Sequence, residues 1–80
     1  MDRPDETLRK SFATALGLPN DDAIAKLEYG RHERWDSVAH MRLVSEIERA
    51  FGVMLEHEDV IGLSSYAAAV EILKRQGIKF

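Results

Sequence analysis

Apolar residues recur at helical spacing in three stretches of the chain, and each stretch predicts an α-helix. The first stretch covers about residues 4–16. Pro4 suits the first position of a helix, and Gly17 suits a left-handed stop just beyond the last. The apolar residues between them fall at i, i+4, i+7 and i+8, which is one helix face. They are Leu8, Phe12, Ala15 and Leu16.

The second predicted helix begins at Asp36 or Ser37 and ends at Phe51, before the stop residue Gly52. Either Asp36 or Ser37 could cap the helix start by accepting a bond from a backbone N–H group. On a wheel that turns by about 100° per residue, one broad apolar face gathers toward the core. The residues of this face are Ala39, Leu43, Val44, Ile47, Ala50 and Phe51.

The last predicted helix begins at Ser64 or Ser65 and ends near Gln76, with Gly77 as its stop. We expect Ile78 to fold back on the end of this helix, as the apolar partner of a Schellman-type stop. The inner stripe of the helix comprises Tyr66, Ala69, Val70 and Leu73.

A shorter stretch, residues 56–62, predicts one or two helical turns. Glu56, Glu58 and Asp59 make it acidic. We expect a solvated face there, with charges that favour a helix start.

A long connection, residues 17–36, separates the first two predicted helices. Asn20, Asp21 and Asp22 could begin a short helical turn within it. Scattered apolar residues should pin it to the bundle, namely Leu18, Ile24, Leu27, Tyr29 and Trp35. No segment alternates with period two for long enough to predict a strand. The expected fold is therefore all-α, a single domain over residues 1–80 built as a small four-helix bundle with three main helices and one short one.

Size and composition reduce the number of function classes that the chain can belong to. A domain of 80 residues is too small to enclose a deep substrate pocket, so we do not expect an enzyme. The formal net charge of −3 argues against a nucleic-acid binder, and the lack of cysteine excludes disulfides and thiolate chemistry. We find no run long enough to span a membrane and no secretory signal in residues 1–10, so we expect a cytoplasmic protein without a membrane partner.

The start of the second helix carries the most suggestive surface. Val38 and Met41 lie beside the apolar face rather than on it, close to Ser37, and polar side chains share this outer side. Exposed apolar residues are common and need no function, but these two could also form a docking patch. Ser37 is open to two interpretations as well: it could be a plain helix cap, or it could hold a phosphodiester, since a helix N-terminus favours a phosphate. The polar side chains are Arg42, Ser45, Glu48 and Arg49.

The run Trp35–Val38, followed by AHMRLVSEIERAFGVML, resembles the phosphopantetheine attachment region of acyl and peptidyl carrier proteins. In that family an Asp-Ser-Leu or Gly-x-Ser-Leu motif opens the second helix, and Val38 stands in place of the usual Leu. The likeness extends from Asp36 to Leu73 without an obvious gap, and the length suits a stand-alone carrier. Beyond the second helix, the residues that match the family are Val53 and Leu55, residues 58–63 and residues 64–66.

The resemblance implies a covalent cofactor. A phosphopantetheinyl transferase would move 4'-phosphopantetheine from coenzyme A onto Ser37, and Asp36 would help to engage the transferase and its magnesium ion. An acyl- or aminoacyl-loading ligase would attach the cargo as a thioester to the thiol of the arm, and downstream acyl-transfer enzymes would take it over. The carrier itself would be a monomer without catalytic activity. The residues expected to contact these partners are Val38, Met41, Arg42, Ser45, Glu48 and Arg49.

The charge of the second helix departs from the pattern of fatty-acid carriers, in which this helix is strongly acidic. Arg42 and Arg49 nearly balance Glu46 and Glu48. Because surface charge governs partner choice, we expect a dedicated pathway rather than general fatty-acid synthesis. The run Met41–Val44 is similar to carriers of peptide or polyketide assembly and to aminoacyl carriers. Arg42–Glu46 and Glu46–Arg49 should also form ordinary surface pairs.

Other sites are poorly supported by the pattern. His32, His40 and His57 do not have the spacing of metal ligands, so we expect no metal site. Ser37, His40 and Asp36 share one helix turn and point to different sides, which argues against a hydrolytic triad. The alternative to a carrier is a helical protein-interaction module without a prosthetic group, in which Ser37 could be phosphorylated.

Overall fold

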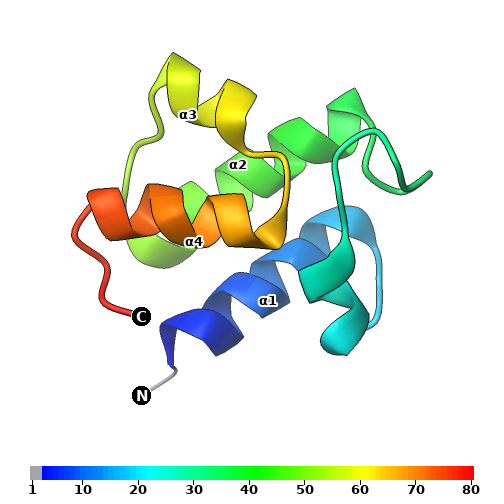
Figure 1. Ribbon diagram of the computed structural model, residues 1–80, viewed down its shortest axis with the longest axis horizontal. Coiled ribbons are helices and arrows are strands. Elements are labelled where there is room, and N and C mark those ends of the chain that lie inside the picture. The colour runs from blue at the N-terminus through cyan, green and yellow to red at the C-terminus, as the bar shows by residue number, and fades with distance from the viewer. Residues whose placement is uncertain (1–2) are drawn as a thin grey trace.

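The computed structural model describes residues 3–80, which form four α-helices and one 3-10 helix in the first connection. Figure 1 shows how the helices are arranged. No strand occurs within these residues, where the β-type pairing is an isolated bridge between Glu28 and Ser65. The expected all-α bundle is thus confirmed, and the helices begin and end within two residues of the predicted positions. The elements are α1 (Pro4–Leu16), η1 (Asp22–Lys26), α2 (Ser37–Phe51), α3 (His57–Gly62) and α4 (Tyr66–Arg75).

Local signals in the sequence account for the helix ends. The side chain of Ser65 accepts a hydrogen bond from the backbone N–H of Ala68 at 3.1 Å and caps α4. At the other end of α4, Gly77 has a φ of 95°, a left-handed conformation that favours glycine. The Ile78 N–H donates to the Leu73 carbonyl at 3.0 Å, and Ile78 packs against the core. This is the predicted Schellman-type stop.

The core lies between α1, α2 and α4, and α1 packs along α2. Ala50 does not join it, contrary to the helical-wheel prediction, and Phe51 is only half-buried. Ala50 instead lines an open groove with polar residues of α1, among them Lys10 and Thr14. The largest fully buried side chains are Trp35, Phe12, Leu8, Ile24, Leu43, Ile47, Leu63 and Leu73.

The long connection is pinned to the bundle by its apolar residues as predicted, except that Tyr29 is 41% exposed. Ile24, Leu27 and Trp35 are buried, and the side chain of Asp21 caps η1 by accepting a bond from the Ala23 N–H at 2.9 Å. The Trp35 ring meets the ring of Phe12 edge to face, with ring centres 5.4 Å apart. The connection therefore fixes the chain just ahead of α2.

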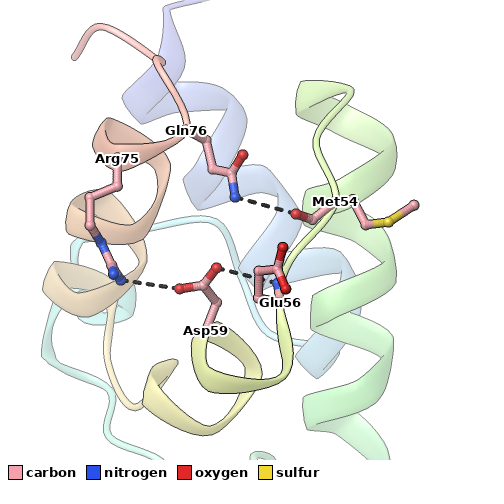
Figure 2. Close-up of polar contacts among 5 residues, drawn as sticks. All are labelled: Met54, Glu56, Asp59, Arg75 and Gln76. Atoms are coloured by element: carbon pink, nitrogen blue, oxygen red, sulfur yellow. Dashed lines mark hydrogen bonds and ion pairs between the residues drawn. The ribbon is translucent and has the colours of Figure 1, made fainter.

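Polar contacts tie α3 to α4, and the end of α4 to the segment ahead of α3, as Figure 2 shows. Asp59 lies between Glu56 and Arg75: its carboxylate accepts from the Glu56 N–H at 3.3 Å and from Arg75 Nη2 at 3.1 Å. The Gln76 amide donates to the Met54 carbonyl at 3.3 Å. The prediction of a wholly solvated acidic face is therefore wrong for Asp59, which is 8% exposed because these contacts draw it inward.

No helix among residues 3–80 is both long enough and apolar enough to cross a membrane.

Candidate functional site

Ser37 is the first residue of α2, and its side chain is exposed. Asp36 fills the capping position, because its Oδ1 accepts a hydrogen bond from the Ala39 N–H at 2.9 Å. The Asp36 carbonyl accepts from the His40 N–H at 2.8 Å. Within residues 3–80 the Ser37 hydroxyl therefore has no hydrogen bond, and it stands free at a helix N-terminus.

An open groove of about 760 Å³ runs from Ser37 along α2, between this helix and the end of α1. Val38 and Met41 line it and are 64% and 55% exposed, so the two apolar side chains lie on the surface as the helical wheel predicted. Arg42, Ser45 and Arg49 continue the lining along α2. The structure thus places five of the six predicted partner-contact residues along one groove that begins at Ser37.

α1 supplies the opposite wall of the groove through Thr14 and Ala15. Ala15 was expected on the apolar face of the first helix, whereas Thr14 was not predicted to matter. The periodicity of one helix says which of its faces is apolar, but not which residues of another helix lie across from it. Ala15 lies at the end of the apolar face of α1, which is a signal in the sequence, but the exposed Thr14 lies off that face and carries none.

Glu48 lies outside the groove. Its Oε2 accepts a hydrogen bond from the Leu55 N–H at 2.9 Å and so anchors the segment that follows α2. The helical wheel placed Glu48 on the outer side of α2 but could not show this contact with a later part of the chain.

The predicted surface pairs on α2 form only in part. Arg49 lies 3.5 Å from the Glu46 carboxylate, as expected. Arg42 does not pair with Glu46, and it makes no ion pair with any of residues 3–80. The Arg42 guanidinium, which lines the groove with Val38 and Met41, therefore has no ion-pair partner among these residues.

His40 forms a buried link under this surface, one helical turn after Ser37. Its Nδ1 accepts a hydrogen bond from Trp35 Nε1 at 3.0 Å, which places the ring proton of the neutral imidazole on Nε2. Nε2 then donates to the Val60 carbonyl at 2.8 Å, and the Tyr29 ring stacks on the imidazole with centres 4.7 Å apart. His40 thus joins the long connection, α2 and α3.

This link gives His40 a structural role. Both of its ring nitrogens are engaged, so it has no nitrogen left to take a proton from Ser37, and a hydrolytic arrangement is not available. Among residues 3–80, no group of three or more His, Asp or Glu side chains is arranged to hold a metal ion. His32 instead accepts a hydrogen bond from the Arg34 N–H at 3.0 Å.

Comparisons of the chain with protein-family models, with curated proteins and with solved structures found no match.

Proposed function

We propose that this protein carries an acyl or aminoacyl group as a thioester on a 4'-phosphopantetheine arm attached to Ser37. The observation that supports this most strongly is the free, exposed hydroxyl of Ser37 on the first residue of α2. A serine that capped the helix would use its oxygen internally, but Asp36 performs that task. The Ser37 oxygen is thus left available as a nucleophile.

The helix start suits the phosphodiester that would form. The N–H groups of the first turn of a helix have no intrahelical acceptor, and the macrodipole favours negative charge at this end. The Ala39 N–H already donates to Asp36. The N–H groups of Ser37 and Val38 are left to donate to a phosphate on the Ser37 oxygen. α2 is 15 residues long, so its dipole is well developed.

The transfer needs a separate enzyme. The Ser37 hydroxyl oxygen would attack the phosphorus of coenzyme A that bears the pantetheine chain, forming a new O–P bond. The bond from that phosphorus to the bridging oxygen would break, adenosine bisphosphate would leave, and a base of the transferase would take the serine proton. One oxygen of Asp36 makes no hydrogen bond with residues 3–80 and is available to the magnesium ion of the transferase.

The arm would supply the sulfur that this chain lacks. A ligase would load the cargo on its thiol, and the tether would then raise the effective concentration of the cargo in partner active sites. Val38 and Met41 flank the attachment point and offer apolar contact to those enzymes. The mixed charge of α2 supports service in a dedicated pathway rather than in general fatty-acid synthesis.

Incubation with coenzyme A, magnesium and a broad-specificity phosphopantetheinyl transferase tests the proposal. The wild-type protein should gain one arm, and Ser37→Ala should gain none. If the folded wild type stays unmodified with several transferases, the exposed groove favours a protein-interaction module without a prosthetic group.

A further inference from the structure

The half of α2 next to Ser37 carries one formal positive charge, that of Arg42, and no negative one. Residues 37–45 contain no Asp or Glu, and Arg42 makes no ion pair within residues 3–80. Asp36 is the carboxylate at this end, and one of its oxygens is turned toward the Ala39 N–H. The chain as a whole carries a formal charge of −3, whereas residues 37–45 carry a single positive charge.

The positive character extends onto α1. A second, polar groove of about 550 Å³ lies next to the first and shares Thr14 and Glu46 with it. Two carboxylates line the two grooves, those of Glu6 and Glu46, and the latter is paired with Arg49. They are outnumbered by four basic side chains, those of Arg9, Lys10, Arg42 and Arg49.

Apolar side chains lie within this basic surface. Val38 and Met41 are one helical turn apart, both are more than half exposed, and Ala15 lies across the groove from them. An apolar side chain entering between them would lose its contact with water. Carboxylates placed toward the C-terminal half of α2 would reach Arg42 and, beyond it, Arg49. Such a combination is typical of an interface with an apolar centre and a charged rim.

We infer that this α1–α2 face docks an acidic segment of a partner enzyme, one that presents an apolar side chain flanked by carboxylates. The inference rests on the proposed function in that the partner is an enzyme acting on the cargo of Ser37. The apolar side chain enters between Val38 and Met41, and Arg42 sets the preference for negative charge.

Two synthetic helical peptides test the inference with the intact chain. Both carry the same apolar stripe of leucines, and glutamates flank the stripe in one while lysines flank it in the other. Proton–nitrogen NMR spectra of the labelled protein report where each peptide binds and how tightly. Arg42→Glu is the test variant, and Lys74→Glu on α4 is a control with the same change of charge at an exposed position.

The inference predicts that the glutamate peptide shifts the amide signals of Thr14, Val38, Met41 and Arg42, and that the lysine peptide does not. Arg42→Glu should weaken binding at least about tenfold, Lys74→Glu less than about twofold, and added salt should weaken it as well. Equal binding of both peptides, binding of neither at about 1 mM, shifts on another face, or equal effects of the two variants would overturn it.

Two further results would overturn the inference by identifying another occupant. The same shifts could appear without peptide when Ser37 carries its arm, which would place the arm itself in the groove. They could also grow with protein concentration, which would place a second copy there. Attachment of the arm to Ser37 is measured separately by mass spectrometry. If the arm is attached but the glutamate peptide does not bind, this inference alone is overturned. If the peptide binds but no arm is attached, only the proposed function is overturned.

Discussion

His40 shows how a single buried residue sets the geometry next to the candidate site. Its imidazole accepts from Trp35 and donates to Val60, and it is 7% exposed. Because α2 is rigid over one turn, whatever fixes His40 also fixes Ser37 relative to α3. The periodicity of α2 could not indicate these partners, because they lie on the long connection and on α3.

Replacement of His40 by alanine should lower the free energy of unfolding by about 2–4 kcal/mol. The Trp35 N–H and the Val60 carbonyl would lose their partner, at about 1–3 kcal/mol for each sheltered group. Urea unfolding followed by the fluorescence of Trp35 measures the change, since this is the one tryptophan of the chain. The exposed His57→Ala should stay within about 0.5 kcal/mol of the wild type, and a similarly small effect of His40→Ala would contradict the structural role.

Tyr66 makes stability depend on alkaline pH. Burial raises the pKa of its phenol, the nearby Asp5 carboxylate raises it further, and Arg9 partly offsets the shift. The hydroxyl donates to the Asp5 carbonyl at 3.0 Å and must keep its proton to do so. The contribution of Tyr66 to the free energy of unfolding is therefore fully present below its unfolded pKa of about 10. It is lost as pH rises through the higher pKa of the folded state.

Tyr66→Phe should cost about 1 kcal/mol of unfolding free energy at neutral pH, the usual net value of one hydrogen bond. Its unfolding free energy should also fall less steeply than that of the wild type when pH rises above about 10. Chemical unfolding at a series of pH values compares the two proteins. Parallel pH profiles would show that Tyr66 does not couple to folding.

At the scale of elements, α3 depends on its neighbours for its position. It has six residues, too few for a stable isolated helix, and Asp59 is its one buried side chain. The Asp59 carboxylate both bonds the Glu56 N–H at the helix start and pairs with Arg75 of α4. The helix-start role followed from the acidic sequence, whereas the pairing with a residue 16 positions later could not be read from local spacing.

Asp59→Ala should destabilise the protein by about 1–3 kcal/mol, since it removes a helix-start contact and a mostly buried carboxylate. Arg75→Ala should cost less, at most about 1 kcal/mol, because its side chain is 69% exposed and water can replace the ion pair. Hydrogen exchange should show the lost protection concentrated in α3. The exposed Glu58→Ala serves as the matched control, and a larger effect of Arg75→Ala than of Asp59→Ala would contradict this account.

At the scale of the whole molecule, the sequence predicted the helices better than it predicted how they meet. Proline, glycine and apolar spacing act locally, so the bounds of α1, α2 and α4 and the stop at Gly77 could be anticipated. Exposure of Val38 and Met41 followed from the wheel of α2 alone. Three features depend on packing or on side-chain conformations that periodicity does not encode. They are the opposite wall of the groove, the absence of an ion pair between Arg42 and Glu46, and the hydrogen bond from the Leu55 N–H to Glu48.

The central claim is that Ser37 carries a phosphopantetheine arm, and intact-protein mass spectrometry tests it most directly. Wild type, Ser37→Ala and Ser45→Ala are each incubated with coenzyme A, magnesium and a broad-specificity transferase. Ser45 is the matched control, an exposed serine on the same groove of α2. The account predicts one added arm on wild type and Ser45→Ala and none on Ser37→Ala. An unmodified wild type, or an arm that persists on Ser37→Ala, would contradict it.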